Sequence, residues 1–512
     1  MSTRISFTFP RILFIAAFSI ISVGGLAKCA IHAQVRSVAI EVITAGEPRV
    51  SVEAESGPSR TWSFPDSYAG TVGLGERVVG LKAFGTNGVQ VSVRQIAPGQ
   101  FKSTEPATRF TYLMKLSPPL NPMDTAKVSW ISDQRGLLML RDLVPALEPR
   151  PEGQAISSHQ PQRLRVTMKV PDGWRYFGND WNGGADFDVS DYDTAVFAIG
   201  SNLRVSQRRI QNTTLSVILD GQWSFTDNEV LDLIAKIYSA HRATFHSSSA
   251  AKATLVLFPF PRPASPTLWT AETRGETVML LSGTLPSKVG ALAQLSTPLT
   301  HELFHLWVPN ALALDGDYDW FYEGFTVYEA ARTAVRLDLL TFPELLNAIS
   351  RAYDGYLNSG DQKQSSLVEA SRARWANQSS VYSKSMVVAF LYDLQLRIQS
   401  RGKHSLEDIY PSLIERYGNR AGADEPARLL DANEAVTAVL GFDDASRAMI
   451  KRLVMQPATI DLKQELLPYG LQVETFGFRT RISVADQLSK QERDLLRQLG
   501  YNDAARNSRH RN

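Results

Sequence analysis

The segment His301-Glu302-Leu303-Phe304-His305 constrains the fold of this chain more than any other feature of its sequence. Side chains four residues apart lie on one face of an α-helix, so both imidazoles reach the same point only if the segment is helical. Glu302 lies about 100° around such a helix from His301, close enough to hold a water at that point without binding a metal itself. The spacing therefore predicts a helix that carries two metal ligands and a general base.

The flanking residues predict where this helix begins and ends. Thr297 and Pro298 favour a start directly before the motif, because proline is well tolerated at the first helical position. Pro309 favours an end near Trp307, because the residue before a proline is driven out of the helical conformation. The predicted helix therefore runs from about residue 297 to about residue 308.

A third ligand for the same metal is expected from Glu323, in the run Trp320-Phe321-Tyr322-Glu323-Gly324-Phe325-Thr326. Asp319 is expected to cap a second helix that begins at Trp320 and carries Glu323 in its first turn. Two imidazoles and a carboxylate are the ligands of a catalytic zinc site, which leaves the fourth tetrahedral position open. We therefore expect one Zn2+ ion. The alternative is an amphipathic core helix whose two histidines are hydrogen-bonded within the protein and bind no metal.

The length and charge of the chain limit its class. A chain of 512 residues is too long for one hydrophobic core, so we expect a multidomain α+β protein. The 54 Lys and Arg residues nearly balance the 52 Asp and Glu residues, which gives no electrostatic reason to expect a nucleic-acid partner.

Residues 1–33 predict a secretory signal peptide. Arg4 and Arg11 precede an apolar stretch from Ile12 through Leu26, and small residues follow. We expect cleavage after Ala33 and a secreted or periplasmic protein. An uncleaved membrane anchor facing the exterior is the alternative, although the apolar run is short for a full span.

The single cysteine, Cys29, offers a third possibility for the N-terminus. Leu26-Ala27-Lys28-Cys29 resembles a bacterial lipoprotein box, except that Lys28 stands where that box has a small residue. If Cys29 is removed or lipidated, the mature fold has no thiol. We therefore expect neither a disulfide nor a cysteine metal ligand.

Residues 34–220 predict a β-rich, sandwich-like domain. Apolar residues alternate with period two most clearly in residues 37–43, 89–96, 109–116, 163–170 and 213–219. A domain of this kind either flanks a substrate or serves as a scaffold or binding module, and the sequence favours neither.

Residues 221–472 predict a mainly helical domain around the metal motif, followed by a short C-terminal extension, residues 473–512. A helix is expected from Phe225 to about Arg242 and a strand at residues 254–258. Thr341-Phe342-Pro343-Glu344 is a capping-box pattern that opens another helix. Residues 381–399 have the apolar spacing of a helix that faces a core.

The two motifs, His301 to Trp307 and Trp320 to Thr326, resemble those of the gluzincin metallopeptidases, most closely the glycyl aminopeptidase family. In that family a β-rich N-terminal domain precedes a thermolysin-like catalytic domain, which is the order expected here. The resemblance implies a zinc-dependent metallopeptidase, possible aminopeptidase activity, and a peptide or protein substrate.

The resemblance also implies a role for each matched residue. His301, His305 and Glu323 would bind zinc, and Glu302 would take a proton from the zinc-bound water and pass it to the leaving amine. The related aminopeptidase N group uses a tyrosine from a Tyr-x-Lys-Gly segment to hydrogen-bond the oxyanion. Tyr382 takes that position here, although Ser385 replaces the glycine and packing is the alternative role for Tyr382.

The resemblance is less complete before the metal helix. Aminopeptidases of these families bind the substrate amine with a glutamate from a Gly-x-x-Glu segment, for which Glu276 is the candidate here, although the pattern is not kept. Residues 277–282 are expected to form the edge strand that pairs with the substrate backbone, and a buried strand is the alternative. Whether the enzyme trims amino ends or cuts internally stays open.

Two other functional classes compete with a peptidase. A catalytically silent binding protein with the same fold predicts a missing ligand or base, and none is missing from the sequence. A zinc hydrolase of a non-peptide bond stays open, because related leukotriene hydrolases open an epoxide on the same scaffold.

Overall fold

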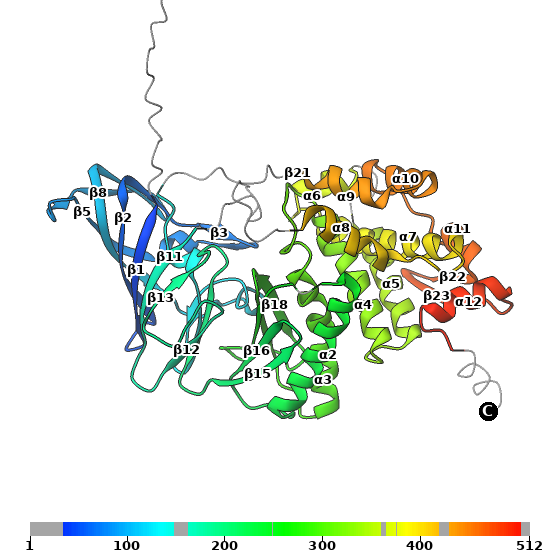
Figure 1. Cartoon of the computed structure of the whole chain (residues 1–512), viewed down its shortest axis with the longest axis horizontal. Helices are drawn as coiled ribbons and strands as arrows, with labels where there is room; N and C mark the ends of the chain where they lie inside the picture. The colour runs from blue at the N-terminus through cyan, green and yellow to red at the C-terminus, as the bar shows by residue number, and fades with distance from the viewer. Residues whose placement is uncertain are drawn as a thin grey trace, which may run out of the picture. The chain divides into compact units, whose positions relative to one another are not determined.

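The computed structural model describes residues 34–147, 162–247, 249–359, 365–374, 376–418 and 430–502 (Figure 1). The predicted signal peptide, its cleavage site and Cys29 lie outside these residues. Among the residues that are described, no helix combines the length and the apolar character that crossing a membrane requires.

An eight-stranded sheet forms the first layer of the β-rich region, in the order β13-β11-β1-β2-β8-β5-β6, with β7 paired to β8. Four of the predicted runs fall in this sheet, and the run at residues 89–96 is divided between β6 and β7. The strand bounds are β1 Val35–Ile43, β2 Arg49–Ser63, β5 Val78–Phe84, β6 Gln90–Val91, β7 Val93–Ala97, β8 Gln100–Lys115, β11 Leu164–Lys169 and β13 Asp186–Val189.

A four-stranded sheet forms the second layer, in the order β12-β14-β10-β9. Its strands are β9 Trp130–Ile131, β10 Arg135–Met139, β12 Arg175–Phe177 and β14 Val196–Gly200. Successive side chains of β10 enter different cores: Leu138 packs with Val52 of the first sheet, whereas Leu137 packs with Val256 of the next. Because successive side chains of a strand point to opposite faces, this sheet lies buried between two layers.

A five-stranded mixed sheet forms the third layer, in the order β15-β16-β17-β19-β18. Its strands are β15 Arg204–Ile210, β16 Thr213–Leu219, β17 Lys252–Pro259, β18 Trp269–Arg274 and β19 Thr277–Ser282. Strands β16, β17 and β19 run parallel, and β18 pairs antiparallel with β19. The expected boundary between residues 220 and 221 falls inside this sheet, because β16 before it pairs with β17 after it.

The expected edge strand is not at the edge of this sheet. Thr277–Ser282 has β17 on one side and β18 on the other, and all six of its residues are buried. The edge-strand prediction for residues 277–282 is therefore wrong, and the alternative of a buried strand is correct. The edge strand is β18, which pairs with β19 on one side only. Its residues are less buried than those of β19.

Helices cover the far face of the five-stranded sheet. Figure 1 shows α2 (Asp227–Phe245) and α3 (Lys288–Glu302) beside β15, β16 and β18. Leu255, Leu257 and Leu280 of the sheet pack with these helices into the largest core. A short helix, α1 Leu140–Leu143, follows β10 in the β-rich region. The other helices after α3 are α4 Thr326–Arg336, α5 Phe342–Leu357, α6 Leu367–Arg372, α7 Ser385–Gln399, α8 Ile409–Tyr417, α9 Ala432–Leu440, α10 Asp444–Ile450, α11 Leu462–Leu466 and α12 Lys490–Gln498.

The C-terminal residues complete this helical core. Strands β22 (Leu471–Phe476) and β23 (Arg479–Val484) form a hairpin, and Leu471, Ile482 and Leu496 are buried in the same core as α5 and α7. The expected boundary at residue 472 therefore falls inside a hairpin. A β-rich N-terminal part and a helical C-terminal part together confirm the α+β class.

Candidate metal centre

Helix α3 carries the metal motif at its C-terminal end, but it begins well before the expected start. The Ser287 side chain accepts a hydrogen bond from the Gly290 N–H at 3.3 Å and caps the helix, and Pro298 lies inside it. Leu295 and Leu299 recur four residues apart and are fully buried. Burial of these leucines stabilises the helix on both sides of Pro298. The free energy gained by this burial outweighs the cost of the backbone hydrogen bond that a proline cannot donate.

The end of the helix follows the prediction more closely. The α-helix ends at Glu302, and a 3-10 turn, Phe304–Leu306, carries His305 onward to Trp307. His305 Nδ1 lies 2.8 Å from the carbonyl oxygen of Val308. Because a carbonyl only accepts, Nδ1 carries the hydrogen, and the lone pair of the neutral ring is at Nε2.

Three potential ligand atoms converge at one point. The Nε2 atoms of His301 and His305 lie 3.0 Å apart, and Glu323 Oε2 lies 3.3 Å and 3.5 Å from them. Nitrogen and oxygen ligands about 2.0–2.1 Å from a tetrahedral zinc are separated by about 3.3 Å. The three separations and the donor types therefore suit one zinc ion, and the structure brings the three predicted ligands together.

Glu323 lies in a π-helical segment, Trp320–Phe325, that continues directly into α4. A second π-helical segment, Ser379–Lys384, carries Tyr382 and packs against it. A Cβ atom on Gly324 would lie 2.1 Å from the Cβ of Ser385, so only glycine allows this approach. Ser385, where the related motif has glycine, is thus accommodated by a glycine on the facing segment.

Arg374 joins these two segments, and sequence reasoning missed it. Its Nη2 donates to Glu323 Oε1 at 2.7 Å and to the Tyr382 hydroxyl at 2.6 Å, while Nη1 donates to Asp319 Oδ1 at 2.9 Å. The predicted role of Asp319 as a side-chain cap is wrong, because this carboxylate binds Arg374 and Tyr322 instead. Arg374 is 51 residues from Glu323 in a turn without a motif, so the sequence held no signal for it.

The electrostatics of the centre suit a metal ligand set. Burial raises the pKa of Glu323, but the charge of Arg374 and the bonds from the two histidines outweigh it and hold the pKa well below the usual range. Burial lowers the pKa of His305, but the hydrogen bond and charge of Glu323 raise it to about 9. A metal therefore competes with a proton for this site.

Tyr382 keeps its proton. Burial and the negative charge of Glu323 raise the pKa of Tyr382 well above its ordinary value, against the opposing charge of Arg374. The hydroxyl accepts from Arg374, so its own O–H remains as a donor. A neutral phenol beside the three ligand atoms is suited to stabilise developing negative charge.

Glu302 is joined to the edge strand of the sheet. The Thr273 hydroxyl lies 2.7 Å from Glu302 Oε2 and 3.0 Å from the Glu302 carbonyl oxygen, and Glu302 is buried. Thr273 belongs to β18. The predicted base therefore lies where the metal helix and the edge strand meet.

The structure places Glu276 in the turn between β18 and β19. Burial and the charge of Asp180 raise the pKa of Glu276 to about 7, and Lys252 opposes them. The predicted role of Glu276 in binding an amine stays a prediction.

A second glutamate, Glu272, lies on the edge strand itself, next to Thr273. Burial raises the pKa of Glu272, the charge of Arg274 lowers it, and the charges of Glu302 and Arg374 also act on it. Electrostatic influence from Glu302 and Arg374 indicates that Glu272 belongs to the surroundings of the metal centre. Sequence reasoning missed this residue because it assigned the edge to the wrong strand.

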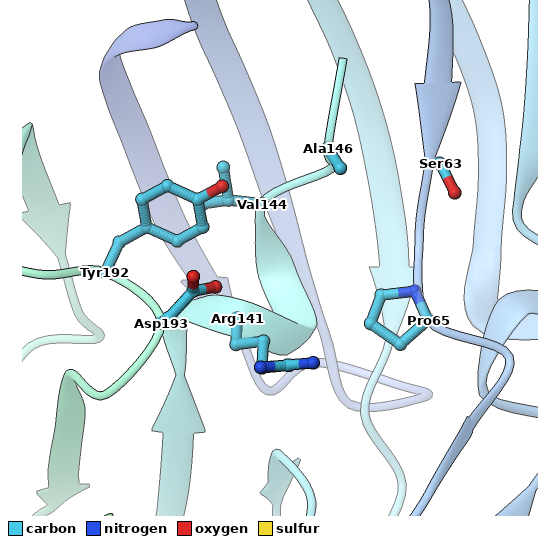
Figure 2. A pocket seen from close by; sticks show the side chains of 7 residues that line it. All are labelled: Ser63, Pro65, Arg141, Val144, Ala146, Tyr192 and Asp193. Atoms are coloured by element: carbon cyan, nitrogen blue, oxygen red, sulfur yellow. The ribbon is translucent and has the colours of Figure 1, made fainter. Parts of the chain in front are cut away.

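A small cavity in the β-rich region is too small to bind a substrate. It is lined by Ser63, Pro65, Arg141, Val144, Ala146, Tyr192 and Asp193 (Figure 2) and has a volume of about 20 Å³. That volume suits a single water molecule. This cavity is therefore not a candidate for the functional site.

His301, His305 and Glu323 form a His2Glu ligand set in an α+β protein whose β-rich layers precede a helical region. No protein-family model matches the sequence, and no curated protein matches it. Among solved structures, the chain is similar to an aminopeptidase N family protein from Idiomarina loihiensis, with a TM-score of 0.69 and 18% identity, over 86% of this chain and 79% of that chain.

The chain is also similar to an M1 zinc metallopeptidase from Deinococcus radiodurans, with a TM-score of 0.53 and 13% identity, over 84% of this chain and 95% of that chain. A mutant of that metallopeptidase bound to a Tyr-Ser-Ala substrate matches with a TM-score of 0.52, 13% identity and the same coverage. These structural neighbours are gluzincins, as the sequence resemblance implied, and at these identities the likeness establishes the fold.

Proposed function

We propose that this protein is a zinc-dependent metallopeptidase that removes residues from the amino ends of peptides. The observation that carries the proposal is the convergence of His301, His305 and Glu323, in a fold shared with M1 zinc metallopeptidases. The charge of Glu302 acts on His305 from the same helix end. A thermolysin-like plan for the catalytic region is part of the same proposal.

Glu302 is the proposed general base. Zinc, when held by His301, His305 and Glu323, supplies a Lewis acid that polarises a peptide carbonyl and makes water more acidic. Thr273 donates to Glu302 Oε2, so we assign proton transfer to Oε1. Glu302 takes a proton from the attacking water there and delivers it to the leaving nitrogen.

Tyr382 is the proposed donor to the oxyanion. Its hydroxyl is oriented by Arg374, which also holds Glu323, so the donor and the ligand are fixed by one guanidinium. A donor that is already in place when charge develops stabilises the transition state without reorganisation.

Recognition of the amino end is assigned to a carboxylate near the base. Glu272 lies on the edge strand β18, where the charges of Glu302 and Arg374 act on it, and this placement supports Glu272 as the group that binds a substrate ammonium. Glu276, in the turn beyond β18, is the competing candidate.

Hydrolysis of paired peptides tests the proposal. Purified protein is assayed with free-amine and N-acetylated forms of the same peptides, with and without chelator. We expect cleavage of the free-amine forms, loss of activity with chelator, and a fall of about 10²–10⁴-fold in kcat for Glu302→Gln with zinc still bound. A Glu302→Gln protein as active as its parent would contradict the proposed base.

Two matched variants test the amino-end assignment. Glu272→Gln should raise KM for free-amine peptides, whereas Glu276→Gln should leave it unchanged; the reverse result would favour Glu276. Equal cleavage of free-amine and acetylated peptides by the parent protein excludes an aminopeptidase.

A further inference from the structure

A hairpin of the β-rich region reaches the edge strand of the metal centre. Tyr68 ends strand β3 (Ser67–Tyr68), which pairs with β4 (Thr71–Val72) through two left-handed residues, Ala69 and Gly70. The Tyr68 hydroxyl lies 2.5 Å from Glu272 Oε1, and 204 residues separate the two in the sequence. Because an ionised carboxylate only accepts, Tyr68 is the donor.

Further contacts fix Tyr68 in this place. The guanidinium of Arg274 lies 4.3 Å from the centroid of the Tyr68 ring and 3.9 Å from Glu272 Oε1. Arg274 also donates to the backbone carbonyl of Lys127, and the Lys127 ammonium donates to the Ala69 carbonyl at 3.2 Å. Contacts from two elements therefore clamp the hairpin onto β18, so the position of the hydroxyl does not depend on one bond.

From this geometry we propose that Tyr68 is a positioning residue for Glu272, and that the β-rich region thereby takes part in selecting substrates with a free amino group. The inference rests on the proposed aminopeptidase function and adds a residue from outside the helical region to its specificity site.

The chemistry of a carboxylate explains the role. An isolated carboxylate rotates about its last torsion, whereas a donor on Oε1 fixes that torsion and leaves Oε2 to accept from an ammonium. The bond also favours the ionised form of Glu272: burial raises the pKa of this group, and the charge of Arg274 and the Tyr68 bond lower it. Only the ionised form attracts an ammonium.

The Tyr68→Phe variant isolates the hydroxyl, because it keeps the ring over Arg274. Binding is measured by calorimetry in a zinc-loaded Glu302→Gln background, with the peptide Tyr-Ser-Ala and its N-acetylated form. We expect Tyr68→Phe to weaken binding of the free-amine peptide about tenfold, the size of one lost charge-assisted hydrogen bond, with no change for the acetylated peptide. The matched control is Tyr176→Phe, which removes a 2.8 Å hydrogen bond to the Gly184 carbonyl away from the centre.

The pH dependence of KM gives a second readout that a purely structural role would not change. The charged or titratable groups that act on Glu272 are Tyr68, Arg274, Glu302 and Arg374. Loss of the Tyr68 bond raises the pKa of Glu272 further, so the rise of KM at acidic pH should begin at a higher pH in Tyr68→Phe than in the parent.

A second variant keeps the inference testable if Tyr68→Phe does not fold. Lys127→Met removes the ammonium that holds the Ala69 carbonyl and leaves Tyr68 and Glu272 intact. We expect a smaller change in the same direction, about twofold weaker binding of the free-amine peptide.

The outcomes separate this inference from the proposed function. If the parent discriminates free-amine from acetylated peptides, Glu272→Gln loses the discrimination and Tyr68→Phe behaves as the parent, the role of Tyr68 is overturned and the aminopeptidase proposal stands. If the parent treats both peptides alike, the aminopeptidase proposal fails and the role of Tyr68 fails with it.

Discussion

Two clusters of polar side chains in the helical region are built on opposite principles. The first, the metal cluster, consists of His301, His305 and Glu323. The second, the Arg–Asp cluster, consists of Asp393 with Tyr328 and Arg397. Glu323 lies in the π-helical segment that directly precedes α4, and Tyr328 lies within α4, so one continuous stretch of helix supplies both clusters.

In the Arg–Asp cluster every acceptor meets a donor. Asp393 Oδ2 accepts from the Tyr328 hydroxyl at 2.6 Å and from Arg397 Nε at 2.9 Å, and Oδ1 accepts from the Leu406 N–H at 2.8 Å. These hydrogen bonds compensate the free-energy cost of burying the Asp393 carboxylate, so the cluster needs no metal ion to complete it.

In the metal cluster, acceptor atoms face other acceptor atoms. Two imidazole nitrogens and a carboxylate oxygen lie 3.0–3.5 Å apart around one point. With neutral histidines and an ionised Glu323 only lone pairs meet there, and a proton on His305, whose pKa is raised to about 9, takes the place that a metal ion would fill. Such a cluster is completed by a cation. The comparison teaches that convergence of acceptors, rather than burial of charge, is what suits a cluster to a metal ion.

The strongest test of this comparison removes one carboxylate from each cluster. Glu323→Gln should lower zinc affinity by more than about a hundredfold and abolish peptidase activity. Loss of a direct metal ligand costs more affinity than loss of a residue that only hydrogen-bonds to a ligand. Asp393→Asn should lower the free energy of unfolding by about 3–5 kcal/mol, because it leaves Arg397 buried without its charge partner.

Zinc content and denaturant unfolding are measured for both variants under the same conditions. Asp393→Asn should retain one zinc per chain at a temperature where it is folded. Loss of zinc from folded Asp393→Asn, or full zinc affinity in Glu323→Gln, would remove the distinction between the clusters.

Arg374 links the metal centre by the kind of contact seen in the Arg–Asp cluster, because its guanidinium donates to carboxylate and hydroxyl acceptors. Arg374→Lys keeps the charge but cannot hold Glu323, Tyr382 and Asp319 together with one planar group. We expect a loss of about 10–100-fold in kcat or zinc affinity, measured by steady-state kinetics and zinc titration. Parent-like values for both would show that the guanidinium only neutralises charge.

His241 is a buried histidine that contacts the metal helix and, within the described part of the chain, has no carboxylate partner among its hydrogen bonds, so burial keeps it neutral. Its Nε2 lies 2.9 Å from the Thr300 carbonyl, and burial, opposed by this bond, lowers the pKa of His241 to about 3. Because the pKa of His241 is lower in the folded than in the unfolded protein, protonation favours unfolding. The free energy of unfolding is therefore unaffected by His241 above about pH 6.5 and falls by about 1.4 kcal/mol per pH unit as the pH is lowered towards 3.

His241→Gln, which keeps a donor for Thr300 without titrating, is the matched variant. Its free energy of unfolding should fall less steeply than that of the parent between about pH 6.5 and pH 4, as measured by denaturant unfolding. Parallel curves for the two proteins would assign the acid sensitivity to other groups.

Local features of the sequence predicted local parts of the structure. The capping box of Thr341 with Glu344 forms as expected, because a capping box involves only four consecutive residues. The same reason explains the metal motif, since the separation of His301 and His305 depends on one helical turn.

Features that depend on distant residues were predicted poorly. The start of α3 was misplaced because Pro298 is a strong local signal, whereas the burial that overrides it comes from the sheet beneath. Strand β19 was taken as the edge because it is apolar and precedes the metal helix, but strand order depends on pairing between segments far apart in the sequence.

By itself, the sequence determined which chemical groups this protein can offer to a metal: two imidazoles one helical turn apart and a carboxylate from the next helical segment, with the carboxylate of Glu302 between the two histidines in the sequence. Only the tertiary structure decided what surrounds them. Arg374 reaches Glu323 across 51 residues, and Tyr68 reaches Glu272 across 204. Residue type and helical spacing are local properties, whereas these contacts exist only because packed layers bring distant segments together.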